Sequence, residues 1–202
     1  MQPFTCSMLS LLAIISFSIS FNFTICLATS RFRLESDSDT NTDFIKASCD
    51  TTRYADLCFK TLSPYADTIQ KNPMELANVA LTVCLKSAKS TSKSVRQLSK
   101  GRDLTTRDGQ AIADCLENMS DSVDEMKKSM VALKGLDGPD FMEKMGNVKT
   151  WVSAAMTDED TCMDGVEENF GNKMKETIRG YIVSVAELTS IALSLITNLS
   201  ST

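Results

Sequence analysis

The chain has 202 residues, a formal net charge of -5 at pH 7 and no histidine. This length suits one domain and is marginal for two, and the acidic balance disfavours nucleic acid, whose affinity comes largely from Lys and Arg on phosphates. The lack of histidine removes the commonest general base and metal ligand, and no nucleophile elbow or phosphate-binding glycine loop occurs. We therefore expect a protein that is not an enzyme and that binds no metal and no cofactor.

The N-terminal segment is typical of a secretory signal peptide. Residues 1–30 contain no Asp, Glu, Lys or Arg, and an apolar run extends from Met8 to Phe21. This run is shorter than the roughly 20 residues of a membrane span, and the small residues Ala28 and Ser30 suit cleavage. We expect removal of residues 1–30, secretion and no membrane attachment afterwards; a retained signal anchor is the alternative.

Two further segments follow the predicted signal peptide. Residues 31–43 are polar and rich in Ser and Asp, which predicts a disordered mature N-terminus. Residues 44–202 are predicted to form one domain. It begins with "CDTTRYADLC", residues 49–58, where Thr51 or Thr52 can cap a short helix and two cysteines can staple a hairpin.

Four long helices are predicted next. Asn72 suits an N-cap and Pro73 a first helical position, so one helix should run to about Lys100, before Gly101. The second helix covers about residues 106–134 and carries a heptad seam of apolar residues. The seam consists of Ile112, Leu116, Met119, Val123, Met126, Met130 and Leu133. Methionines in such a seam are far more often core than ligand surface.

The third and fourth helices repeat the seam pattern. The third begins at Pro139, and its seam runs through Phe141, Met145, Val148, Val152 and Ala155 before it meets Glu159. An acid on the seam predicts a kink or local opening near Thr157. The fourth covers about residues 172–200, with one apolar column at Ile178, Val185, Ala192 and Leu199 and another at Tyr181, Leu188 and Leu195.

These elements predict an all-α fold. Four amphipathic helices joined by short links form an antiparallel up-down four-helix bundle, here preceded by a short N-terminal helical hairpin and fastened by two disulfides. Five cysteines remain after loss of Cys6 and Cys26, which allows two disulfides and a free thiol in 15 arrangements. Antiparallel second and third helices bring Cys115 and Cys162 level; Cys49 and Cys58 close the hairpin, and Cys84 is left as a buried free thiol.

Glycosylation sequons occur at three asparagines. Asn22 lies in the predicted signal peptide, Asn118 lies inside the second helix, and Asn198 lies near the end of the chain. Asn198 and Asn118 are therefore the possible glycosylation sites. Asn198 is favoured, because Asn118 lies inside a predicted helix.

Three segments together resemble a known family. They are "CDTTRYADLC" at 49–58, "DCLENMSDSVDEM" at 114–126 and "WVSAAMTDEDTCMDG" at 151–165. These segments and the four-cysteine framework resemble the plant pectin methylesterase inhibitor / invertase inhibitor domain over residues 44–200. The resemblance implies a four-helix bundle after a small helical hairpin, with the first two cysteines paired and the helix-2 cysteine paired with that of helix 3. It also implies a protein of the plant cell wall (the apoplast) that binds one target enzyme molecule and covers its active-site cleft.

The resemblance favours pectin methylesterase as the target. The esterase-inhibitor pattern C-E-N-x-x-D-x-x-D has counterparts after Cys115, and the third helix supplies further matching residues; the implied partner-binding set is Glu117, Asn118, Asp121, Asp124, Thr157, Thr161 and Asp164. Glu117, Asp121 and Asp124 fall at i, i+4 and i+7, on one helical face. A free-standing inhibitor is expected rather than the pro-region of an esterase, because the sequence given ends shortly after the fourth helix.

Two alternatives remain. Acid invertase inhibitors of the family have a Pro-Lys-Phe motif where this chain has Pro139-Asp140-Phe141, and the reversed charge argues against invertase. The second alternative is a non-inhibitory secreted helical bundle, in which the acids are only a solvated helix face.

Overall fold

The structure is a computed structural model that describes residues 39–100, 104–136, 138–169 and 172–199. The predicted signal peptide, residues 1–30, and residues 31–38 lie outside the described residues. The chain divides into a unit of residues 1–41 and a second unit, Thr42–Thr202, which holds every element discussed below. Residues 39–43, predicted to be disordered, are helical. The polar composition hid this helix, whose later residues Ile45 and Cys49 are fully buried.

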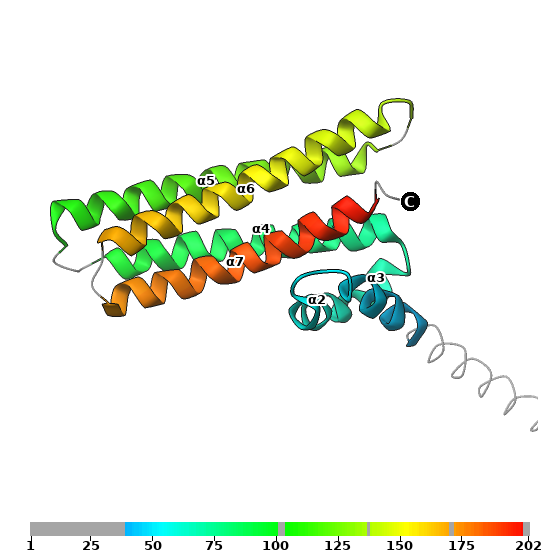
Figure 1. Ribbon diagram of the computed structural model, residues 1–202, viewed down its shortest axis with the longest axis horizontal. Coiled ribbons are helices and arrows are strands. Elements are labelled where there is room, and N and C mark those ends of the chain that lie inside the picture. Colours follow the sequence, from blue (N-terminus) through cyan, green and yellow to red (C-terminus); the bar gives the residue numbers. More distant parts are fainter. Residues whose placement is uncertain (1–38, 101–103, 137, 170–171, 200–202) are drawn as a thin grey trace, which may run out of the picture. The chain divides into compact units, whose positions relative to one another are not determined.

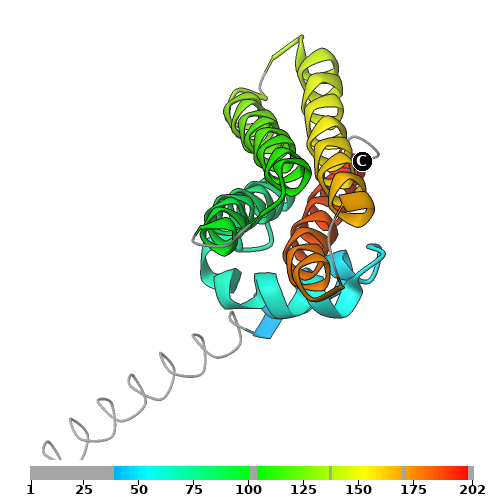
Figure 2. The ribbon, with the colours of Figure 1, turned by 90° about the vertical axis from the view of Figure 1, so that its left-hand side faces the viewer.

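The second unit is a four-helix bundle with a small helical segment at one end. Its long helices are α4 (Pro73–Ser99), α5 (Thr106–Lys134), α6 (Phe141–Asn169) and α7 (Asn172–Leu199). Consecutive helices run in opposite directions (Figure 1), and α4 packs against α5 and α7, as does α6. Figure 2, which looks along the bundle, shows the four helices at the corners of a square, with α4 diagonally opposite α6. The predicted antiparallel bundle is confirmed.

The segment before the bundle is short and helical. It consists of α2 (Ala55–Leu62), the 3-10 turn η1 (Ser63–Tyr65) and α3 (Ala66–Ile69). The hydroxyls of Thr51 and Thr52 donate to the carbonyls of Ser48 and Cys49, at 2.7 and 2.8 Å. They therefore finish the preceding helical turn, and the expectation that either would cap the next helix is wrong: α2 begins without a side-chain cap.

The start of α4 follows the sequence signal directly. Asn72 Oδ1 accepts hydrogen bonds from the backbone N–H groups of Met74 and Glu75, at 2.9 and 3.3 Å. Pro73 occupies the first helical position, where its missing N–H leaves no hydrogen bond unmade. The predicted N-cap is confirmed, because a short acceptor side chain satisfies N–H groups that have no partner within the helix.

The heptad seams predicted for α5 and α6 form the core. Met119, Met126 and Met145 are fully buried and fill space between the helices. In α7, the predicted residues Ile178, Val185, Ala192 and Leu195 are buried, whereas Tyr181 is 39% exposed. Ile182, Thr189 and Ile196 are buried as well but were not in the predicted columns. Thr189 reads as a polar residue in sequence, and its hydroxyl is satisfied inside the bundle by Glu159 and by the carbonyl of Val185.

The helix α6 passes through Thr157 without interruption, so the predicted local opening is wrong. Glu159 stays on the seam and has no exposed surface. Hydroxyl groups of Ser122 and Thr189 donate hydrogen bonds to its carboxyl group and partly compensate its loss of water.

Both predicted disulfides are present. They join Cys49 to Cys58 and Cys115 to Cys162, and Cys84 is a buried free thiol. The helix Met174–Leu199 is long and apolar enough to cross a membrane, but its inward side is packed in the bundle, where Ile178, Ile182 and Ile196 are fully buried.

Candidate functional site

Helices α5 and α6 form a pair that is fastened near both ends. The disulfide Cys115–Cys162 joins the first half of α5 to the second half of α6. At the opposite end, Lys144 Nζ donates 2.8 Å to the carbonyl of Gly135 and lies 3.0 Å from a carboxylate oxygen of Asp140. These contacts hold the surfaces of the two helices in one register, so that residues far apart in the sequence face a common outer surface.

A shallow groove of about 290 Å³ lies on this outer surface, beside the Cys115–Cys162 disulfide. Its walls are about two turns of α5 and little more than one turn of α6. They are formed by Ala111, Asp114, Cys115 and Asn118 from α5, and by Thr161, Cys162, Asp164 and Gly165 from α6. We call this hollow the α5–α6 groove. It brings together three of the residues singled out from the sequence, namely Asn118, Thr161 and Asp164.

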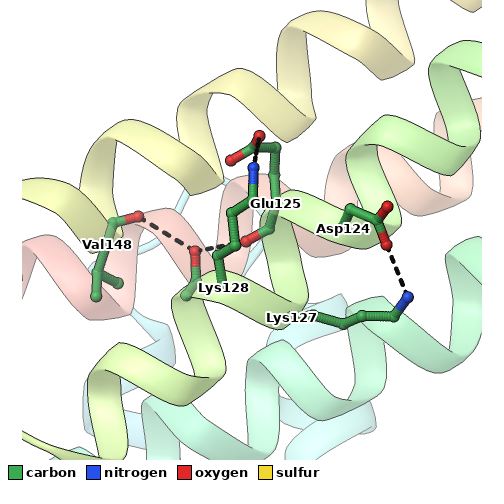
Figure 3. Close-up of polar contacts among 6 residues, drawn as sticks. Asp124, Glu125, Lys127, Lys128 and Val148 are labelled. Carbon is green, nitrogen blue, oxygen red and sulfur yellow. Dashed lines mark hydrogen bonds and ion pairs between the residues drawn. The ribbon is translucent and has the colours of Figure 1, made fainter.

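The other residues singled out from the sequence do not line the groove. Glu117, Asp121, Asp124 and Thr157 are exposed on the same two helices. Asp124 is paired with Lys127 at 2.7 Å, and the hydrogen bond and charge of Lys127 lower the pKa of Asp124 (Figure 3). Thr157 lies one turn before Thr161, whose hydroxyl donates 2.8 Å to the carbonyl of Thr157. The hydroxyl oxygen of Thr161 is thereby left to accept a hydrogen bond.

An acidic cluster formed by Asp121, Glu125 and Asp158 continues along the two helices from the groove. Partial burial, then the charges of Asp121 and Glu125, raise the pKa of Asp158. Glu125 lies on the side of α5 that faces α6 (Figure 3), where Oε1 accepts 2.8 Å from Lys128 and the buried Oε2 has no hydrogen-bond partner. The cluster therefore holds carboxylate charge that is incompletely compensated among the described residues.

Glu125 and Asp158 were not among the residues singled out from the sequence, although their spacing from the cysteines carries a usable signal. Asp158 precedes Cys162 by one helical turn, so it lies on the same side of α6 as the disulfide. Glu125 lies ten residues after Cys115, close to three turns along α5. Reading both helices outward from the disulfide would have placed these acids beside the seam.

A second polar site lies inside the bundle. Glu159 Oε1 accepts hydrogen bonds from Ser122 on α5, at 2.8 Å, and from Thr189 on α7, at 3.0 Å. Burial raises the pKa of Glu159 to about 7, against the lowering effect of these two hydrogen bonds. Burial, followed by the charge of Glu159, raises the pKa of the Cys84 thiol on α4. The four helices thus meet at one buried carboxyl group, which has no exposed surface.

Asn198, the sequon asparagine near the end of the chain, is exposed, and its Nδ2 donates a hydrogen bond of 2.9 Å to Thr51 Oγ1. Among the described residues, no group of three or more Cys, Asp or Glu side chains is arranged to hold a metal ion. The arrangement offers instead a rigid, hydrogen-bonding and acidic surface that can bind another molecule.

Comparisons with known proteins agree with this architecture. The model of a family described as plant invertase/pectin methylesterase inhibitor matches residues 43–195. A protein named pectinesterase inhibitor 10 from Arabidopsis thaliana is 46% identical over 166 residues, which cover 81% of this chain and 53% of that protein. This chain therefore spans about half the length of that relative. A 21 kDa protein from Daucus carota is 46% identical over 159 residues, covering 77% of this chain and 82% of that protein.

The fold also matches a solved structure. The crystal structure of a mutant form of a pectin methylesterase inhibitor from Arabidopsis matches with a TM-score of 0.60 and 21% identity, over 74% of this chain and 92% of that one. At this identity the match concerns the fold.

Proposed function

Since the chain belongs to the plant invertase/pectin methylesterase inhibitor family, we propose that it is a secreted inhibitor of plant pectin methylesterase. It acts as an inhibitor and not as an enzyme, binding one-to-one and covering the active-site cleft of the esterase. The single observation that carries this proposal is the α5–α6 groove, in which Asn118, Thr161 and Asp164 lie together beside the Cys115–Cys162 disulfide.

The groove residues are suited to contact at the centre of an interface. Asn118 supplies both donors and acceptors, Thr161 an acceptor oxygen, and Asp164 a carboxylate. The disulfide and the Lys144 contacts hold the two helices before binding. Little conformational freedom is then lost on docking, which favours affinity.

The surrounding acids are suited to steering. Glu117 and Asp121 are exposed, and Asp158 beside Asp121 is partly buried. Complementary charge at the edge of an interface mainly raises the association rate and selects among partners. Asp124 is expected to contribute less, because Lys127 already pairs with its carboxylate.

The cell wall is the proposed site of action. Two disulfides in a chain of this size favour an oxidising compartment, and the uncharged residues 1–30 suit export.

Acid invertase is the less favoured target. At the start of α6, Asp140 forms an ion pair with Lys144 at 3.0 Å, so its carboxylate is directed to a structural contact at the α5–α6 turn. A Lys-recognising site on an invertase would find the opposite charge there.

The test is inhibition of methanol release from methyl-esterified pectin by a plant pectin methylesterase at about pH 6. Titration with the protein should abolish release at one equivalent, while a parallel titration of acid invertase leaves sucrose hydrolysis unchanged. Inhibition of the invertase alone would establish the alternative target. Full activity of both enzymes in an excess of the protein would support the other alternative, a helical bundle that inhibits neither enzyme.

A further inference from the structure

Helix α4 carries a row of positive charge on its outer side. Five basic residues, spaced by three and four positions, are exposed along the second half of the helix and at its C-cap: Lys86, Lys89, Lys93, Arg96 and Lys100. We call this row the basic stripe. Its positions recur at helical spacing, so the side chains share one face, and it is about 21 Å long at the rise of an α-helix.

The charge of the stripe is segregated from that of the rest of the chain. Residues 86–100 contain these five cations and no acid, whereas the remaining 16 Lys and Arg are outnumbered by 26 Asp and Glu. Solvated helix faces usually alternate the two signs. Within the described residues, none of the five is in an ion pair, although Lys127, Lys128, Lys144 and Arg179 all are.

The helix itself does not account for the stripe. Cations stabilise the last turn of a helix through its dipole, which explains Arg96 and Lys100 but not residues two or more turns earlier. Lys86 and Lys89 lie in the middle of α4, with like charges three and four positions away. Like charges at such spacing destabilise a helix, so the stripe is unfavourable unless an anion is bound.

The stripe is bordered by groups that can hydrogen-bond. Ser90 and Gln97 are exposed beside it, and a shallow hollow lies at its C-terminal end, lined by Lys93, Arg96, Gln97 and Lys100. The exposed row faces away from the buried residues Cys84, Ala88 and Val95 of the same helix. Because α4 packs against α5 and α7, the stripe stays open when a partner occupies the α5–α6 groove.

We propose that the basic stripe binds a linear polymer of uronic acids. An extended chain with regularly spaced carboxylates and free hydroxyls matches a straight row of cations interspersed with Ser and Gln side chains. The identity of the polymer rests on the proposed function: hydrolysis of pectin methyl esters leaves uronic acid carboxylates, so such a chain is the product of the inhibited enzyme. Binding through the stripe would hold the inhibitor on de-esterified polymer next to esterase that is still active.

The affinity of such a site comes from repetition. Each exposed ion contact is weak and screened by salt, but contacts along one polymer act together through their high effective concentration. Binding is therefore expected for long uronate chains at low salt and is expected to weaken steeply with ionic strength.

The test measures binding of the full-length protein to polygalacturonate and to fully methyl-esterified pectin of matched length. We expect binding to polygalacturonate only, lost between roughly 20 and 200 mM NaCl. The triple variant K89Q/K93Q/R96Q should bind at least about tenfold more weakly, since each exposed ion contact accounts for only a few-fold. The control K46Q/K60Q/K134Q removes the same charge at exposed positions outside the stripe and should bind as the wild type does.

Three outcomes would overturn the proposal: equal weakening by both triple variants, equal binding of the esterified polymer, or self-association of the protein that the stripe variant alone abolishes. Inhibition of pectin methylesterase at 200 mM NaCl should be unchanged in K89Q/K93Q/R96Q. Retained inhibition without polymer binding refutes the stripe alone, and polymer binding without inhibition refutes the proposed function alone.

Discussion

The hydroxyl of Ser122 on α5 donates a hydrogen bond of 2.8 Å to Oε1 of Glu159 on α6, at the centre of the bundle. Thr189 on α7 lies 3.0 Å from the same oxygen and 3.1 Å from the carbonyl of Val185. The single hydroxyl proton of Thr189 cannot serve both acceptors fully. Oε2 of Glu159 is buried without a hydrogen-bond partner, and an unpaired oxygen costs more when the carboxyl group is charged than when it is protonated.

Stability should therefore fall as the pH rises through the titration of Glu159. Burial raises the pKa of Glu159 to about 7 from 4.5. Below pH 4.5 both states are protonated; between the two values only the folded state keeps the proton, so unfolding becomes easier with rising pH. The loss is on the order of 3 kcal/mol by pH 8. Asp158, whose pKa is also raised by burial, adds a smaller change of the same sign.

Urea unfolding at pH 4.5, 6 and 8 checks this stability profile. Glu159→Gln should flatten it and make the protein more stable than the wild type at pH 8. Glu143→Gln is the matched control, because Glu143 is an exposed glutamate of the same helix whose charge does not act on Glu159, and it should keep the wild-type slope. A Glu159→Gln protein that still loses stability between pH 4.5 and 8 would assign the effect to other groups.

Inhibition of the esterase should weaken from pH 5 to pH 8. Partial burial, Asp121 and Glu125 already raise the pKa of Asp158, and docking of a protein surface would remove more water from the acidic cluster. A raised carboxyl pKa gives a contribution that is complete at low pH and lost as pH rises through it. Protonation also weakens steering toward a positively charged partner surface, but screened charges contribute less than buried ones.

The inhibition constant of wild type, Asp158→Asn and Glu159→Gln at several pH values separates the two titrations. Asp158→Asn should reduce the pH dependence of inhibition, and Glu159→Gln should leave it. Tighter inhibition at pH 8 than at pH 5 would contradict the role given to the cluster.

Filling the α5–α6 groove should abolish inhibition without unfolding the protein. Thr161→Arg places a long cation where Asn118 and Asp164 approach, and loss of a central contact typically costs at least about 2 kcal/mol, or about 30-fold in affinity. Thr197→Arg is a matched control: Thr197 is an exposed α7 residue whose hydroxyl also bonds the carbonyl four residues earlier. Equal inhibition by wild type and Thr161→Arg would remove the groove from the interface.

The Cys115–Cys162 disulfide should stabilise the protein more than Cys49–Cys58 does. Its cysteines are 47 residues apart, against 9 for the other pair. The chain-entropy model gives about 4 kcal/mol for the longer loop and about 3 kcal/mol for the shorter one. Urea unfolding of C115A/C162A and C49A/C58A measures the difference. Loss of inhibition is also expected in C115A/C162A, and a larger stability loss in the hairpin variant would be the contrary result.

Asn118 should carry no glycan in an active inhibitor. Its side chain lines the α5–α6 groove, and an attached sugar would occupy the space proposed for the esterase. Ser120→Ala removes the sequon while keeping Asn118. The mass of the plant-expressed variant should differ from that of the wild type only by the replaced side chain, and both proteins should inhibit equally. If the wild type is heavier by the mass of a glycan and still inhibits fully, the interface lies elsewhere.

The sequence by itself determined the helices and their pairing. Local signals were sufficient for α4, because the Asn72 cap and Pro73 act within one turn. The seam of α5 and the position of Cys162 on α6 placed Cys115 and Cys162 level, since the short links leave neighbouring helices only an antiparallel arrangement. The resemblance to the family singled out Asn118, Thr161 and Asp164 together with Glu117 and Asp124. Residue spacing did not predict that the first three line a groove while the other two lie exposed outside it.

Only the tertiary structure decided which polar residues lie inside. Glu159 on the α6 seam predicted a kink or local opening, and Thr189 was not among the residues predicted to face the core in α7. They can be buried because Thr189 and Ser122 both donate hydrogen bonds to Glu159 Oε1, so that side chains from three different helices meet there. Hydrophobic periodicity describes one helix at a time, whereas the free energy of burying a polar group depends on partners that other helices supply.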